Sequence, residues 1–216
     1  LSPNDGPTHH GLFDLSYLRC IPHAIVMQPK DEDELQDMMA TGIGSGLPSF
    51  VRYPRGAGTG VLRKEKPAVL PIGKAEVLKE GKGCAIWALG NFVPVAEKIA
   101  EHLYSKHGLR VSVINARFVK PIDEQLLLSQ LVTHDSIITL EDNVLKGGFG
   151  SAILETLDQN DILIPVKRFG WPDEFIEHGN SVSDLRKNHG LDDESIISDA
   201  EEFLKLDSGC GAPLIA

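Results

Sequence analysis

The feature that most constrains the fold is a regular alternation, from Cys84 onward, of short apolar runs with segments of helical periodicity. The first run is almost wholly apolar, as expected of a strand in a sheet that is covered on both faces. Four runs of this kind predict strands at residues 85–89, 111–114, 136–140 and 164–169. Strands that alternate with helices at this spacing indicate βαβ units and a mostly parallel sheet.

Helices are predicted between and after these strands from apolar residues three and four positions apart. Asp123 and Ser181 are good N-cap residues for two of them, and Gly108 is a typical helix stop. The predicted helices cover residues 94–107, a short segment after Asp123, a segment opened by Gly147 and Gly148, residues 181–190, and a last segment around 196–204.

The part of the chain before residue 60 is shorter and less complete. It predicts a strand at residues 23–27, a helix capped by Asp31 with Glu34 three residues later, and a strand at 49–53 that ends at Pro54. Two strands and one helix cannot cover both faces of a parallel sheet. We therefore expect residues 1–59 to be the second half of an α/β domain whose first half lies upstream of Leu1.

The predicted domain boundaries follow from these elements. Residues 60–83 are rich in Lys, Gly and Pro and are expected to form a linker, although residues 72–78 could form an edge strand. Residues 84–206 are expected to form a complete second domain with three αβα layers. Residues 207–216 are expected to be a flexible tail.

Composition excludes several classes of function. The net charge of −10 argues against a nucleic-acid partner, which needs a basic face. No apolar run reaches the roughly 20 residues of a membrane span. Three cysteines without a Cys-x-x-Cys pair predict neither a disulfide framework nor a zinc site, and they fit a reducing compartment.

The richest ionisable chemistry lies near the start, in residues 5–19. Two adjacent histidines, His9 and His10, stand there with Asp5, Asp14 and Arg19. Histidine is the only side chain whose unperturbed pKa, about 6.5, allows proton exchange near neutrality. The stretch precedes the first predicted strand, so it is expected on a loop, where catalytic groups concentrate. The plainer interpretation is a turn with solvated histidines.

Six sequence blocks carry a resemblance that runs over nearly the whole chain. The blocks are residues 5–22 (DGPTHHGLFDLSYLRCIP), 51–56 (VRYPRG), 70–74 (LPIGK), 117–121 (RFVKP), 147–151 (GGFGS), and 172–176 (PDEFI) with 178–179 (HG). They resemble the 1-deoxy-D-xylulose-5-phosphate synthases, which are thiamine-diphosphate-dependent members of the transketolase superfamily. General transketolases share the start of the first block, but they differ at residues 13–19.

The resemblance implies both a fold and an activity. It implies a partial pyrimidine-binding α/β domain at residues 1–59, followed by a transketolase C-terminal-type domain. The implied enzyme is a transferase that decarboxylates pyruvate and joins the two-carbon unit to glyceraldehyde 3-phosphate. Its product feeds isoprenoid and thiamine biosynthesis, and it is expected to be a homodimer in the bacterial cytoplasm or the plastid stroma.

Three residues gain roles by this resemblance. His9 would be the catalytic histidine beside the thiamine ring, and Asp5 would contact substrate hydroxyls. Arg55 would hold the phosphate of the triose, because a guanidinium matches phosphate bidentately. For Asp5 the plainer role is that of a turn former. For Arg55 it is an ion pair with a local carboxylate.

Several other polar residues are interpreted as structural. They include Arg19, Arg52, His10 and Asp14, and His178 is expected to pack or to lie at an interface. Glu141 and Asp142 form an acidic pair after the strand at 136–140, for which no upstream partner is expected. A metal site at His9 and His10 lacks a third ligand at a recognisable spacing.

The parts that the family uses to bind its cofactor are absent from this sequence. No Gly-Asp-Gly motif, which holds the Mg²⁺ of the diphosphate, occurs in the chain. The cofactor-binding residues are therefore unknown, and thiamine diphosphate and Mg²⁺ are expected only in a longer protein with an N-terminal cofactor domain. This chain is expected to be inactive alone. Alternatives are a transketolase, a 2-oxoacid dehydrogenase β-subunit, or a non-catalytic dimerisation or regulatory module.

Overall fold

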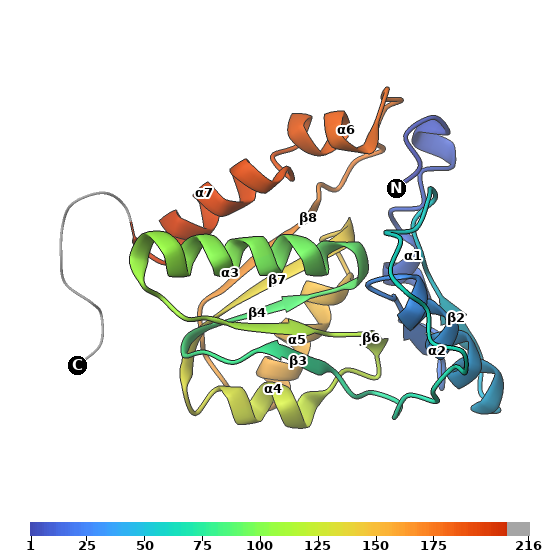
Figure 1. Cartoon of the computed structure of the whole chain (residues 1–216), viewed down its shortest axis with the longest axis horizontal. Coiled ribbons are helices and arrows are strands. Elements are labelled where there is room, and N and C mark those ends of the chain that lie inside the picture. Colours follow the sequence, from blue (N-terminus) through green and yellow to red (C-terminus); the bar gives the residue numbers. More distant parts are fainter. Residues whose placement is uncertain (207–216) are drawn as a thin grey trace.

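A twisted five-stranded sheet forms the centre of the fold in a computed structural model of the chain, in which residues 1–206 are described (Figure 1). The spatial order of its strands is β3 (Glu76–Lys79), β5 (Ser112–Asn115), β4 (Gly83–Ala88), β7 (His134–Val144) and β8 (Val166–Trp171). Strands β5, β4, β7 and β8 run parallel, and β3 pairs antiparallel at one edge. The predicted mostly parallel sheet is therefore confirmed.

Alternate residues of β4 enter two separate hydrophobic clusters. Ile86 and Ala88 pack in the cluster that contains α3 and α7, whereas Ala85 and Trp87 pack in the cluster that contains α4 and α5. Because side chains alternate across a strand, the two clusters lie on opposite faces of the sheet. The three αβα layers are confirmed, with α3 (Val93–His107) and α7 (Asp193–Phe203) on one face, and α4 (Glu124–Gln130) and α5 (Phe149–Gln159) on the other.

Helix ends follow the predicted capping residues. The carboxylate of Asp31 accepts a hydrogen bond from the Glu34 amide at 2.7 Å, and Asp123 accepts one from the Leu126 amide at 3.2 Å. Ser181 caps α6 (Val182–Asn188) in the same way. Each such cap stabilises a helix by about 0.5–2 kcal/mol. These local signals explain why the helices begin where the sequence predicts.

The N-terminal part shares a sheet with the second half of the chain. Its strands β1 (Ile25–Met27) and β2 (Ser49–Val51) pair in parallel, as part of a three-stranded sheet. The third strand is β6 (Phe118–Lys120), which comes from the second half of the chain and pairs antiparallel with β1. No strand was predicted there. The two halves are therefore joined through a shared sheet, and the N-terminal part also contains α2 (Glu32–Gly44) and the short helices η1 (Gly6–Thr8) and α1 (Asp14–Leu18).

Residues 60–83 are more ordered than a linker. An edge strand does form, but at Glu76–Lys79 instead of 72–78, and it belongs to the five-stranded sheet. The start of the segment is attached to α2 through the Glu32 carboxylate, which accepts hydrogen bonds from the Thr59, Gly60 and Val61 amides at 2.5–3.1 Å. A hydrogen bond from the Glu32 amide, and then one from the Thr59 hydroxyl, lower the pKa of Glu32 to about 2.

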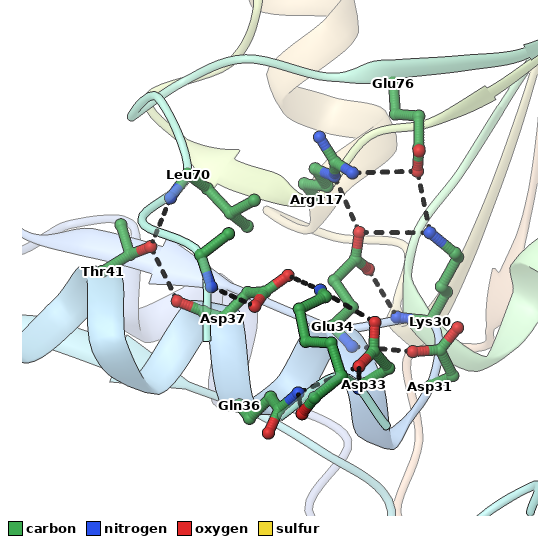
Figure 2. A network of polar contacts seen from close by, with 12 residues as sticks. Lys30, Asp31, Asp33, Glu34, Gln36, Asp37, Thr41, Leu70, Glu76 and Arg117 are labelled. Atoms are coloured by element: carbon green, nitrogen blue, oxygen red, sulfur yellow. Dashed lines mark hydrogen bonds and ion pairs between the residues drawn. The ribbon is translucent and has the colours of Figure 1, made fainter. Parts of the chain in front are cut away.

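A polar network fixes α2 against the central sheet (Figure 2). The almost fully buried Glu34 accepts hydrogen bonds from Arg117 Nε at 2.7 Å and from Asn115 Nδ2 at 2.8 Å. Arg117 and Lys30 also reach Glu76 of β3, at 3.0 and 2.8 Å. Glu34 of the N-terminal part is thus held by Arg117 and Asn115 of the second half. The Lys30 amide, just before α2, donates a further hydrogen bond to it.

The predicted tail at 207–216, which contains Cys210, lies outside the described residues. Of the two other cysteines, Cys20 is exposed and Cys84 is buried, and neither forms a disulfide. None of the helices within residues 1–206 has the length and apolarity that crossing a membrane requires.

Candidate active site

The opening loop, defined as residues 1–13, folds around a glycine that no other residue could replace without strain. Gly6 has φ +64°, and a Cβ at this position would come within 2.2 Å of the His178 imidazole. Only glycine adopts this conformation at little cost. His178 therefore packs directly on the turn between Asp5 and His9, and the Gly179 amide donates to the Pro3 carbonyl at 3.1 Å.

Two of the three predicted site residues lie in contact. Arg55 Nη1 donates to the Asp5 carboxylate at 2.5 Å and to the Ser2 hydroxyl at 3.2 Å. The hydrogen bond from Ser2, and then the one from Arg55, hold the pKa of Asp5 below its ordinary value. Asp5 is therefore ionised at neutral pH. The ion pair is open to solvent, with 66% of the Arg55 side chain exposed.

His9 is exposed, and it lies near enough to Asp5 for its charge to act on that carboxylate. Its Nδ1 is 2.8 Å from the Thr8 hydroxyl, an interaction that orients the imidazole. Its positive form would also favour the ionised form of Asp5, because its charge contributes to the lowered pKa of that carboxyl. An exposed imidazole thus lies within electrostatic reach of an exposed carboxylate–guanidinium pair.

His10, next in sequence, is in a different environment. It is buried, its Nδ1 accepts a hydrogen bond from the Leu12 amide at 3.2 Å, and burial lowers its pKa. Its ring packs against Phe13 and Phe175, with centroids 5.1 and 6.3 Å away. These aromatic rings line an open hollow of about 550 Å³ next to the loop. His10 is thus a neutral packing residue near the site.

Arg19 and Arg52 connect the loop region to the second half of the chain. Arg19 donates to the Gly147 carbonyl at 2.7 Å and pairs with Glu155. Arg52 donates to Asp142 at 3.2 Å and to the Gly11 carbonyl at 3.0 Å. Both cations hold backbone carbonyls and carboxylates, and neither lies free beside the Asp5–Arg55 pair.

The expectation that Glu141 and Asp142 have no upstream partner was wrong for Asp142. Its upstream partners are Arg52, at 3.2 Å, and the amino group of Leu1, at 2.9 Å. The next residue, Asn143, also bonds upstream, to the Leu15 amide at 3.2 Å. The sequence did indicate that these residues have a role, because Glu141, Asp142 and Asn143 directly follow a buried apolar strand. Loops that bind ligands gather at this edge of a parallel sheet. The partners lie about ninety residues or more away, so local patterns do not identify them.

The hydrogen bonds of Glu141 within the described residues all join it to the second half of the chain. It is fully buried and accepts hydrogen bonds from the amides of Phe149 and Gly150 at 2.6 and 2.8 Å, at the first turn of α5. Burial raises the pKa of this carboxyl to about 8, against the opposing effect of the two amides. Its oxygens satisfy two backbone amides at the start of α5, so Glu141 fixes α5 to β7.

The described residues do not supply a site for a metal-bound diphosphate. Within residues 1–206, no three His, Cys, Asp or Glu side chains lie together as metal ligands would. Asp5 is paired with Arg55, and Asp142 with Arg52.

Two family models match the chain. The model described as transketolase, C-terminal domain, matches residues 73–196, and the model described as transketolase, pyrimidine binding domain, matches residues 2–59. The first match covers the central sheet and most of the helices that flank it. The second covers the opening loop, α2 and the strands β1 and β2.

Curated relatives include the 1-deoxy-D-xylulose-5-phosphate synthases of Acidobacterium capsulatum and Aquifex aeolicus. The first is 52% identical over 204 residues, which are 94% of this chain and 32% of the relative. The second is 50% identical over 202 residues, which are 94% of this chain and 32% of the relative. The chain thus spans about a third of the length of the curated relatives that it matches.

Solved structures of similar fold include a split-gene transketolase described as an inactive β4 tetramer. It has a TM-score of 0.80 and 29% identity, over 93% of this chain and 64% of that one. The transketolase from Leishmania mexicana has a TM-score of 0.70 and 20% identity, over 98% of this chain and 30% of that one. The second likeness concerns the fold alone.

Proposed function

We propose that this chain, which belongs to the transketolase family, is part of a thiamine-diphosphate-dependent 1-deoxy-D-xylulose-5-phosphate synthase. The complete enzyme would decarboxylate pyruvate and transfer the two-carbon unit to glyceraldehyde 3-phosphate. The observation that carries the proposal is the exposed contact between Asp5 and Arg55, with His9 within electrostatic reach of that carboxylate. Relatives with this printed name are about half identical to the chain over nearly its whole length.

Arg55 would hold the phosphate of the triose. Both of its hydrogen bonds within the described residues use Nη1, which leaves Nε and Nη2 as a two-donor fork. Such a fork matches two phosphate oxygens. The contact with Asp5 limits the movement of the side chain, so less conformational freedom remains to be lost on binding.

His9 would transfer a proton at the reacting carbon–oxygen bond, and Asp5 would accept hydrogen bonds from substrate hydroxyls. Thr8 restrains the histidine through Nδ1, so Nε2 is the nitrogen that remains for the substrate. Positioned acid–base catalysis of this kind contributes about 10²–10⁴-fold in rate. The lowered pKa of Asp5 keeps its oxygens as acceptors throughout the neutral range.

The cofactor would be bound mainly by a part of the protein outside this chain. Thiamine diphosphate with Mg²⁺ would supply the carbanion chemistry, and this chain would supply the groups that bind and orient the triose and move its protons. We therefore infer that the chain alone is inactive, that an N-terminal cofactor domain completes the site, and that the active form is a homodimer. A bacterial cytoplasm or a plastid stroma would be its compartment.

A second candidate is a separate subunit that needs a partner chain. The split-gene transketolase, whose printed description is of an inactive β4 tetramer, matches 93% of this chain. A protein of that kind would have the same fold and would be without activity until its partner is added. Other superfamily activities, a transketolase or a 2-oxoacid dehydrogenase β-subunit, would differ in the donor that they use.

The test is an assay of the purified chain and of a longer polypeptide that contains it. Both are incubated with glyceraldehyde 3-phosphate, thiamine diphosphate and Mg²⁺, with either pyruvate or a ketose phosphate as donor. We expect release of CO₂ and formation of 1-deoxy-D-xylulose 5-phosphate only from the longer polypeptide and only with pyruvate. Use of the ketose phosphate would instead identify a transketolase.

A further inference from the structure

Three consecutive polar residues at the end of β7, Glu141, Asp142 and Asn143, are completely buried. Burying a carboxylate or an amide is costly unless its atoms are paired. Glu141 is paired within the second half of the chain, but Asp142 and Asn143 are paired with the opening loop and the segment that follows it. We propose that Asp142 and Asn143 are positioning residues, which hold the loop so that His9 and Asp5 meet the substrate. The proposal rests on the proposed function.

Asp142 acts through Arg52. Its Oδ2 accepts from Arg52 Nη1 at 3.2 Å, while Arg52 Nη2 donates to the carbonyl of Gly11 at 3.0 Å. The same carboxylate accepts from Trp171 Nε1 at 2.8 Å and from Asn91 Nδ2 at 3.3 Å. Asp142 therefore fixes a guanidinium that in turn fixes the backbone two residues after His9.

The charge on Asp142 is stable at neutral pH. Burial would raise the pKa of this carboxyl, but the Arg52 guanidinium nearby and the Trp171 hydrogen bond hold it well below the ordinary value. Arg52 is itself largely buried, with 8% of its side chain exposed. In a buried ion pair, the loss of one member leaves an unpaired charge, which costs far more than the loss of an exposed pair.

Asn143 holds the chain a few residues later. Its Oδ1 accepts from the Leu15 amide at 3.2 Å, and its Nδ2 donates to the Ser16 hydroxyl at 2.9 Å. Ser16 in turn donates to the Lys146 carbonyl at 2.7 Å. Since Leu15 and Ser16 lie in α1, one amide side chain fixes the helix that follows the loop to the end of β7.

A backbone bond completes the attachment, because the Val144 amide donates to the Leu12 carbonyl at 2.8 Å. The chain from Gly11 to Ser16 is thus bonded at three successive points to the last residues of β7, directly or through Arg52. In Figure 1, α1 lies beside the end of the central sheet. The opening loop is therefore held in place by the second half of the chain.

The test compares two buried-amide variants of the longer, active polypeptide. Asn143→Ala removes the contacts to Leu15 and Ser16. Gln130→Ala is the matched control, because Gln130 is also a buried amide, its Oε1 accepts from Trp87 Nε1 at 2.9 Å, and it lies in the second half away from the opening loop. For each variant, kcat, KM, the melting temperature and hydrogen exchange of residues 5–16 are measured.

We expect both variants to lose thermal stability, but only Asn143→Ala to lose rate. A misplacement of reacting groups by about 1 Å can lower a rate about 10²-fold, so kcat should fall about 10- to 100-fold more than in the control. Amide exchange over residues 5–16 should become faster in Asn143→Ala and stay unchanged in Gln130→Ala. If Asn143→Ala does not fold, Ser16→Ala removes one of the same contacts from the loop side and takes its place.

Equal kcat in the two variants, or unchanged exchange over residues 5–16 in Asn143→Ala, would overturn the proposal. The proposed function can fail separately, and His9→Ala distinguishes the two cases. If His9→Ala keeps full activity, the proposed catalytic role of the loop is wrong, while the exchange result still decides whether Asn143 holds the loop. If His9→Ala is inactive and Asn143→Ala is as active as the control, the positioning role alone is wrong.

Discussion

Replacement of Glu34 by Ala should destabilise the whole chain, because this buried carboxylate joins the N-terminal part to the central sheet. Its Oε1 accepts from Arg117 Nε at 2.7 Å and from Asn115 Nδ2 at 2.8 Å, and its Oε2 accepts from the Lys30 amide at 2.8 Å. Breaking a buried pair by removal of one partner costs about 3–5 kcal/mol. Arg117 and Lys30 keep their second contact with Glu76, so we expect the lower end, about 3 kcal/mol.

The matched control is Glu76→Ala, which removes the other carboxylate of the same network. Glu76 is more accessible, with 34% of its side chain exposed, and a pair of this kind contributes about 1 kcal/mol or less. In a domain of this size, 1 kcal/mol corresponds to about 2–4 °C, so Glu34→Ala should melt about 6–12 °C lower than the unmodified chain. The melting temperature is measured by calorimetry and the free energy of unfolding by urea titration, both at neutral pH. Equal losses in the two variants would refute the reasoning.

Three further outcomes are expected. His9→Ala should lower kcat of the longer polypeptide about 10²–10⁴-fold without a change in melting temperature, and an unchanged kcat would remove His9 from the chemistry. Gly6→Ala should add about 1–3 kcal/mol of backbone strain at φ +64°, seen as a lower urea midpoint, and an unchanged midpoint would contradict this role of the glycine. Glu201 has a pKa lowered to about 2 by hydrogen bonds from Lys106 and then His107. A carboxyl whose pKa is lower in the folded state stabilises the fold at pH values above its unfolded-state pKa. That stability should be lost as pH falls from about 4.5 to about 2, and Glu201→Gln should make the melting temperature depend less on pH in this range.

Local signals allowed much of the fold to be predicted from the sequence. The apolar run at residues 85–89 predicted a fully covered strand, and β4 enters both hydrophobic clusters. Asp31, Asp123 and Ser181 predicted helix starts, and each accepts the expected hydrogen bond from an amide three residues later. In all these cases the interaction that decides the structure joins residues that are neighbours in sequence.

The parts that were missed depend on pairs far apart in sequence. Strand β6 is three residues long and carries no period of its own, and it exists because β1, about ninety residues earlier, offers a free edge. For the same reason the partner of Asp142 was missed, since Arg52 is placed beside it by the fold alone. The contact between Asp5 and Arg55 spans fifty residues, and motif resemblance brought the two residues to attention without placing them together.

The measurement that tests the central claim most directly is the response of the Arg55→Ala variant of the longer polypeptide to two acceptors. Glyceraldehyde 3-phosphate and glyceraldehyde differ only in the phosphate that Arg55 is proposed to hold. A lost charge-assisted contact costs about 1.5–3 kcal/mol, so KM for the phosphorylated acceptor should rise about 10- to 100-fold while KM for glyceraldehyde stays the same. An equal rise for both acceptors, or no rise for either, would contradict the assignment of this edge as the triose phosphate site.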